Sequence, residues 1–154
     1  MSDQVSSIDA VVTLREVTPD ALWSILNLQV SKEQEQFVAS NAISIAQAHY
    51  SREAWFKAIY ADETPVGFVM LAQDLDRGRY FLWRFMIDAR YQRKGYGRKA
   101  LQLVIEHVKL MPNANEFRLS YHKADGSPQP FYEKLGFRDT GRMLDDEYEM
   151  NLKL

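Results

Sequence analysis

The clearest chemical signal in the sequence is a basic, glycine-containing loop over residues 92–98 (QRKGYGR). It lies between an apolar run and a segment with helical periodicity. A helix N-terminus presents free N–H groups and a positive dipole end to anions, and glycines let a ligand approach the backbone closely. Arg93, Lys94 and Arg98 add positive charge. The loop predicts a phosphate or pyrophosphate site, although a plain strand-to-helix turn with solvated basic residues would fit the same letters.

Two other phosphate-binding motifs fit the sequence less well. Residues 95–100 (GYGRKA) also match the dinucleotide fingerprint G-x-G-x-x-[GA], and Glu116 has about the spacing of its ribose-binding acid. However, Glu116 opens its strand, whereas a ribose-binding acid belongs at a strand's carboxyl end. That fingerprint also belongs to an all-parallel sheet, so it ranks well below the first interpretation. The P-loop pattern does not occur in the chain.

The segments that flank the loop must position it. Arg79 to Ile87 (RYFLWRFMI) is strongly apolar and predicts a buried strand, and alternation over residues 116–121 predicts another. Between them, a helix from about residue 94 to 109 is predicted by apolar residues at i, i+3, i+4 and i+7: Leu101, Val104, Ile105 and Val108. A strand, helix, strand succession implies a parallel crossover.

The rest of the chain predicts a largely antiparallel sheet with further helices. Short polar turns join the predicted strands before residue 88, which indicates a meander. The predicted strands are Val11 to Val17, Trp55 to Tyr60, Val66 to Ala72 and a closing strand over residues 148–154. The predicted helices are Ala21 to Val30, one or two short helices over Ser31 to Tyr50, and Pro128 to Leu135.

Composition narrows the class of protein. The 154 residues predict a single domain over residues 1–154, and the formal net charge of -2 gives no general basic field for nucleic acid. The chain has no cysteine, and its three histidines share no metal-ligand spacing, so we expect no metal. The N-terminus lacks the pattern of a signal peptide and no run is long enough to span a membrane, so we expect a cytoplasmic protein.

Two motifs together resemble the GNAT superfamily of N-acetyltransferases. Residues 92–97 match its acetyl-CoA signature, [Gln/Arg]-x-x-Gly-x-[Gly/Ala], and residues 131–137 (FYEKLGF) are similar to the segment that closes the acetyl-CoA site. With the order of strands and helices, the resemblance covers Val11 to Leu154. It implies a central mixed, largely antiparallel sheet of about seven strands, splayed between strands 4 and 5 and flanked by about four helices.

The resemblance also implies a set of site residues. Acetyl-CoA would lie in the splay, with backbone groups of Phe85, Met86 and Ile87 bonded to its pantetheine. Tyr132 would act as the acid that protonates the departing CoA sulfur, although a tyrosine that only packs its helix would look the same. The pyrophosphate would be held at the loop by Gln92, Arg93, Lys94, Gly95, Tyr96, Gly97 and Arg98.

The acceptor predicted by the resemblance is a primary amine. Residues 36–48 look like a helical segment of the spermine/spermidine acetyltransferase-like branch, which implies a polyamine. The alternatives are a protein N-terminus, an aminoglycoside-like metabolite, or a non-catalytic module that senses CoA. Relatives are often homodimers, so the resemblance allows for a homodimer.

The base is left open by the sequence. An alkyl ammonium has a pKa of ~10.4 and must lose a proton before it can attack a thioester. Glu33 and Glu35 could bind the ammonium or order a water that relays its proton, but surface glutamates are more often simply solvated. His122, just past a strand end, has a suitable side chain, but a lone histidine there is more often a loop residue.

Overall fold

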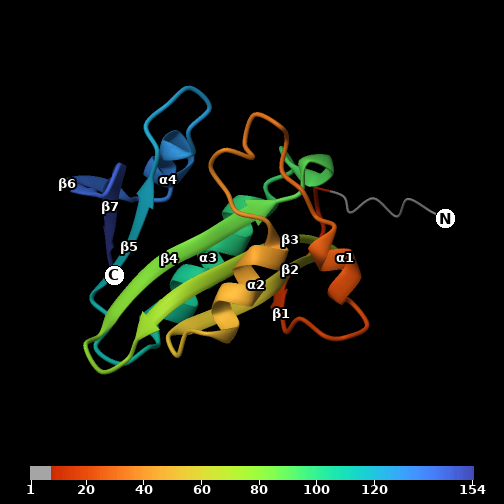
Figure 1. The fold of residues 1–154 in the computed structure, drawn as a ribbon, viewed down its shortest axis with the longest axis horizontal. Coiled ribbons are helices and arrows are strands. Elements are labelled where there is room, and N and C mark those ends of the chain that lie inside the picture. Colours follow the sequence, from red (N-terminus) through yellow and green to blue (C-terminus); the bar gives the residue numbers. More distant parts are fainter. Residues whose placement is uncertain (1–7) are drawn as a thin grey trace.

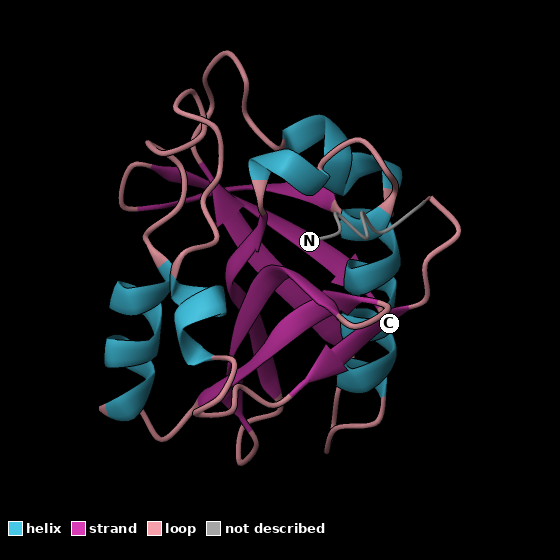
Figure 2. Ribbon diagram, turned by 90° about the vertical axis from the view of Figure 1, so that its right-hand side faces the viewer, coloured by secondary structure: helices cyan, strands magenta, loops and turns pink. Residues whose placement is uncertain are grey.

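The computed structural model describes residues 8–154, in which one seven-stranded sheet carries helices on both faces (Figures 1 and 2). The strand order is β1-β2-β3-β4-β5-β7-β6. The strands are β1 Val12–Arg15, β2 Ala54–Ala61, β3 Thr64–Asp74, β4 Arg79–Ile87, β5 Glu116–Tyr121, β6 Arg138–Leu144 and β7 Glu147–Lys153. The helices are α1 Leu22–Leu26, α2 Asn41–His49, α3 Tyr96–Lys109 and α4 Gln129–Lys134, with a 3-10 turn, η1, at Ala89–Tyr91.

The predicted splay between β4 and β5 is confirmed by the strand register. All other neighbouring strands pair antiparallel, whereas β4 and β5 are parallel and share only the pairs Phe81 with Arg118 and Leu82 with Leu119. Figure 1 shows the two strands close at their lower ends and apart above. Beyond Leu82, therefore, the β4 edge that faces β5 has no strand partner.

A β-bulge lies where the two strands separate. On β3 the neighbours Leu71 and Met70 pair with Leu82 and Arg84, so Trp83 is an extra residue in β4. A bulge bends its strand and ends regular pairing locally. The bulge also changes which β4 residues face each side: Leu82 lies in the core under α3, and so does Ile87 beyond it.

The two faces of the sheet hold separate cores. Under α3 and α4, the core includes Leu101, Val104, Phe117 and Phe137. Under α1 and α2, a second core includes Ile25, Tyr60, Phe68, Met70 and Met86. The predicted apolar face of α3 is buried as expected. Within residues 8–154, no helix is long and apolar enough to cross a membrane.

Three segments differ from the sequence prediction. Helix α1 has only five residues, and the following stretch, the α1–α2 loop (residues 27–40), consists of turns, so Glu33 and Glu35 do not lie on a helix. Helix α2 begins where the Ser40 hydroxyl accepts a hydrogen bond from the amide of Ile43 at 3.2 Å. Strand β6 was not predicted from the residue pattern, because all its residues are exposed and it shows no apolar alternation.

The contact between β3 and the end of β4 generates a stability prediction. A Cβ at Gly67 would lie 2.3 Å from the carbonyl oxygen of Met86 and 2.9 Å from Cδ1 of Ile87. Gly67→Ala should therefore force the two strands apart at a cost of about 1–3 kcal/mol. We expect a fall in Tm of roughly 3–10 °C, measured by thermal unfolding.

The matched control is Gly97→Ala. A Cβ at Gly97 would come no closer than 3.5 Å to Ile87 and Phe131, an ordinary contact, and the residue is helical. Its Tm should stay unchanged or rise slightly, because alanine favours a helix over glycine. Equal Tm values for wild type and Gly67→Ala would contradict the packing argument.

Candidate active site

A single large cleft opens where β4 and β5 diverge. It has a volume of about 1130 Å³, and we call it the splay cleft. Its walls come from the α1–α2 loop, β4 from Phe81 to Ile87, the N-terminus of α3, the end of β5, the N-terminal part of α4 and the β6–β7 turn. Segments distant in sequence thus meet at one opening in the sheet.

One end of the splay cleft is the N-terminus of α3. Gly95 forms the N-cap with a φ of 83°, a left-handed conformation that glycine adopts without strain. Within residues 8–154 no side chain caps this helix, and its first turn holds no acidic residue, so the positive end of its dipole favours an anion. The loop residues that line the cleft here are Gln92, Arg93, Gly95, Tyr96, Gly97 and Arg98.

The predicted anion-site residues do not all have the same position. Arg93 and Arg98 are exposed and line the splay cleft, whereas Lys94 is half-buried and does not line it. The side chain of Tyr96 is 1% exposed and belongs to the core under α3, so only its backbone can serve a ligand. The groups positioned to contact an anion at this end are therefore backbone amides and the side chains of Arg93 and Arg98.

Gln92 has a structural contact within the protein. Its amide nitrogen donates to the carbonyl oxygen of Ile87 and to Oε1 of Gln34, both at 2.8 Å. These bonds tie the loop before α3 to the end of β4 and to the α1–α2 loop. Gln92 therefore supports the shape of the predicted anion site through its side chain, and its partner Gln34 was not selected from the sequence.

Asp88 supports the same region and was not identified from sequence. Its carboxylate is 3% exposed and accepts from the amides of Arg90 and Gln29, each at 2.9 Å, and from the Arg90 guanidinium. Burial raises the pKa of Asp88, but these hydrogen bonds outweigh it and hold the pKa below its usual value. Asp88 thus fixes the chain between β4 and α3 to the α1–α2 loop.

The middle of the splay cleft is the free edge of β4. Phe85, Met86 and Ile87 lie beyond the last β5 pair. Backbone groups alternate between the two edges of a strand, so those of Phe85 and Ile87 face this edge and can pair with an extended ligand, whereas those of Met86 face β3. Their side chains hold the strand in place on both faces. Met86 and Ile87 lie in opposite cores, and the Phe85 ring stacks on Phe131 at 6.0 Å.

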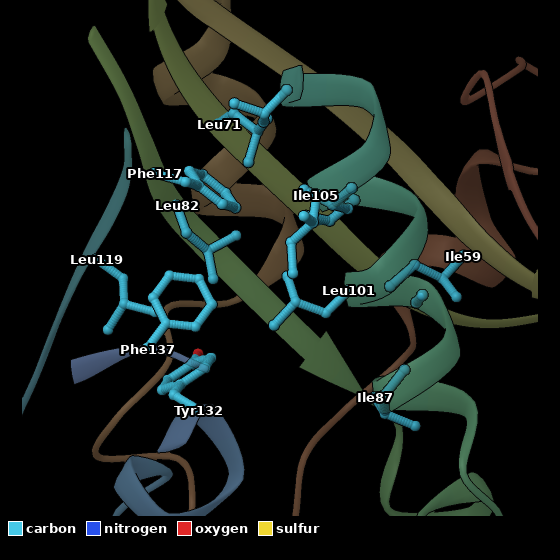
Figure 3. Close-up of a cluster of buried hydrophobic side chains, with 14 of the residues drawn as sticks. Ile59, Leu71, Leu82, Ile87, Leu101, Ile105, Phe117, Leu119, Tyr132 and Phe137 are labelled. Carbon is cyan, nitrogen blue, oxygen red and sulfur yellow. The ribbon is translucent and has the colours of Figure 1, made fainter. Parts of the chain in front are cut away.

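Tyr132 lies at the centre of the splay, on the face covered by α3. Its ring is 8% exposed and packs edge-on against Phe131 and Phe137. Figure 3 shows Tyr132 beside Phe137. The described part of the chain offers its hydroxyl no hydrogen-bond partner, and the residue lines the cleft. Burial raises the pKa of this hydroxyl above its usual value, so it stays protonated at neutral pH.

The other end of the splay cleft carries carboxylates and the half-buried cation of Arg84. Glu35, Asp145 and Glu147 line it, but Glu33 does not. From β4, Arg84 donates to Oε1 of Gln47 at 2.9 Å and to the Trp83 carbonyl at 3.0 Å. Burial lowers the pKa of the Arg84 guanidinium, and the negative charge of Glu147 opposes this.

Comparison with known proteins places this geometry in a family. Residues 20–137 match the model of the acetyltransferase (GNAT) family. The chain is 30% identical over 141 residues to the spermine/spermidine N(1)-acetyltransferase of Bacillus subtilis, covering 86% of this chain and 91% of that protein.

Solved structures share the fold at low sequence identity. The PaiA N-acetyltransferase of Thermoplasma acidophilum, crystallised with coenzyme A, matches with a TM-score of 0.73 and 18% identity, over 94% of this chain and 99% of that one. A variant of SpeG spermidine N-acetyltransferase from Vibrio cholerae matches with a TM-score of 0.72 and 15% identity, over 92% and 93%. The chain belongs to the acetyltransferase (GNAT) family and is an N-acetyltransferase.

Proposed function

We propose that this N-acetyltransferase transfers the acetyl group of acetyl-CoA to a primary amine of a polyamine. The observation that carries the proposal is the splay cleft itself, which has an anion site at one end, carboxylates at the other and Tyr132 beside the free β4 edge. The relative from Bacillus subtilis is a spermine/spermidine acetyltransferase, and the PaiA structure contains coenzyme A, which supports both substrates.

The residues present fit acetyl-CoA at the α3 end. The pyrophosphate is assigned to the positive N-terminus of α3, with Arg93 and Arg98 beside it. Gly97 leaves open the space that a Cβ would fill between Ile87 and Phe131. Backbone groups of Phe85 and the amide of Ile87 on the free edge would pair with the pantetheine as a neighbouring strand would, whereas the backbone of Met86 faces β3 and the Ile87 carbonyl accepts from Gln92.

Acetyl transfer in this cleft proceeds by direct attack in a ternary complex. The amine nitrogen bonds to the thioester carbon, backbone N–H groups of the β4 edge stabilise the oxyanion, and the carbon–sulfur bond breaks. The buried hydroxyl of Tyr132 carries the proton that the departing thiolate needs. This assignment follows from its position and from its protonation at neutral pH.

A polyamine suits the charge at the acceptor end. The carboxylates of Glu35, Asp145 and Glu147 line this end and attract a ligand with several ammonium groups. Arg84 supplies a positive charge there, so among these four side chains negative charge predominates. Of the two glutamates selected from the sequence, we therefore assign substrate contact to Glu35 rather than Glu33.

The central test is an acetylation assay with a panel of amines. The protein would be incubated with acetyl-CoA and spermine, spermidine, a monoamine, a peptide N-terminus or an aminoglycoside, while free thiol is measured. We expect thiol release with the polyamines and much less with the others. Turnover of the peptide alone would reject the polyamine assignment, and no release with any amine, together with tight CoA binding, would indicate a sensor.

The anion site generates a binding prediction. Gly97→Ala should weaken CoA binding about tenfold or more, equivalent to ~1.4 kcal/mol, because the new methyl group occupies space at the cleft floor. Titration calorimetry measures the change, and the unchanged Tm expected above shows that the fold is intact. An unaltered Kd would place the pyrophosphate elsewhere.

The acid assignment generates a kinetic prediction. Tyr132→Phe keeps the ring that packs on Phe131 and Phe137 and removes only the hydroxyl. We expect kcat to fall by ~100-fold to ~10,000-fold, with CoA affinity and Tm little changed. Steady-state kinetics and thermal unfolding on the same protein distinguish a general acid from a tyrosine that only packs its helix. Full activity of the variant would exclude an acid at this position.

The acceptor assignment generates a specificity prediction. Glu35→Gln should raise KM for spermidine by roughly 2–5-fold, as expected for loss of one exposed ion pair, and leave KM for a monoamine nearly unchanged. Glu106→Gln, on α3 and outside the cleft, is the matched control. Equal KM values for spermidine in both variants would remove Glu35 from the acceptor site.

A further inference from the structure

His122 lies directly after β5, on the face of the sheet opposite Tyr132. Along β5, Phe117, Leu119 and Tyr121 are buried in the core under α3 and α4. Because successive side chains of a strand alternate between faces, Ser120 and His122 point to the α1–α2 side. His122 is half-buried and lines the splay cleft there.

Two carboxylates lie beside this imidazole. One ring nitrogen of His122 and one carboxylate oxygen each of Asp146 and Glu147 lie within 4.8 Å of one another. The pairing of Tyr121 with Tyr148, continued by one residue, puts His122 opposite Glu147. The Ser120 hydroxyl donates to Glu147 at 3.2 Å, which holds that carboxylate in place. The histidine is therefore part of an ordered group, unlike the isolated loop residue considered from sequence.

The other groups around His122 come from the α1–α2 loop, β4 and the β6–β7 turn, and they include its possible proton-exchange partners. From the α1–α2 loop, the Phe37 ring lies 6.5 Å from the imidazole and Glu35 lines the same end of the cleft. From β4, Arg84 faces Glu147, and from the β6–β7 turn Asp145 also lines the cleft. Lys123 lies over the Tyr148 ring instead, at 5.2 Å.

These neighbours leave His122 as the group best suited to accept a proton. Arg84 stays charged and cannot act as a base, and the carboxylates are weak bases at neutral pH. Histidine is the side chain whose ordinary titration range includes neutral pH. The acceptor amine would reach the thioester from this face, while Tyr132 serves the sulfur from the other.

We propose that His122 is the general base of the acetyl transfer, positioned by Glu147. The inference rests on the proposed function. The imidazole accepts one proton from the ammonium, giving a neutral amine and an imidazolium, and the amine then forms the carbon–nitrogen bond. As the carbon–sulfur bond breaks, Tyr132 protonates the thiolate and regains a proton from the acylated nitrogen. The imidazolium returns its proton to water, so the net products are amide, CoA thiol and one proton.

The test compares His122→Gln with His49→Gln, since His49 is exposed at the end of α2 and outside the splay cleft. With spermidine as acceptor, His122→Gln should lose ~100-fold to ~10,000-fold in kcat/KM, and His49→Gln should lose little. Wild type should also show a fall in kcat/KM at acid pH that His122→Gln lacks. Glu147→Gln should lose less and keep that acid-side fall.

A weakly basic acceptor separates proton removal from packing. An amine made more acidic by fluorination is largely neutral at the assay pH, so it needs no base. The kcat/KM for this amine should be nearly equal in wild type and His122→Gln. If His122 were only structural, the variant would lose kcat/KM equally with spermidine and with the fluorinated amine, and that result would overturn the proposal.

Two further results would overturn it. If activity is lost with a chelator and restored by zinc, the His122, Asp146 and Glu147 group holds a metal instead. If His122→Gln keeps wild-type kinetics while wild type acetylates polyamines, only the base is misassigned. A wild-type protein that acetylates no amine at all would instead remove the proposed function.

Discussion

The functional architecture depends on one interruption of backbone hydrogen bonding. In an uninterrupted sheet the backbone N–H and C=O groups of β4 and β5 would hydrogen-bond along the whole length of both strands. The β4 edge beyond Leu82 would then be unavailable to a ligand. The bulge at Trp83 bends β4 away, and its free edge becomes a backbone template beside a cleft. Unpaired backbone N–H and C=O groups at a strand edge inside a sheet raise the free energy of the fold unless another group hydrogen-bonds to them. This edge is therefore suited to bind an extended ligand.

The protein stabilises this opening from both sides. Gln92 and Asp88 tie the end of β4 to the α1–α2 loop, and Tyr132 with Phe137 packs between α4 and the core under α3 (Figure 3). On the far side of the splay, Glu149 is 3% exposed and accepts hydrogen bonds from Thr140 and Arg142, which fixes exposed β6 to β7. The cleft walls are thus held by contacts that do not need a ligand.

The sequence predicted best those parts whose physics is local. β4 was predicted with its observed bounds, and the i, i+3, i+4 pattern located α3, because each buries a continuous apolar face. The α1–α2 loop was missed as a loop because its composition permits a helix, and β6 was missed because an exposed edge strand has no periodic apolar signal. The loop before α3 could be selected as a candidate anion site from sequence, since one contiguous segment builds it, and that assignment stays a prediction.

Of the proposed acceptor end, only Glu35 was selected as a substrate-binding candidate from the sequence, because this end is made of single residues from four separated segments. No motif in the sequence around Arg84, Asp146 or Glu147 marks these residues as functional. Only the pairing of β5 with β7 brings His122 beside Glu147. The arrangement has a chemical logic that follows from the splay. Deprotonating an ammonium and protonating a thiolate need groups in opposite protonation states. Burial keeps the Tyr132 hydroxyl protonated on one face of the sheet, and the imidazole of His122 lies beside Asp146 and Glu147 on the other face, from which we propose that the amine enters.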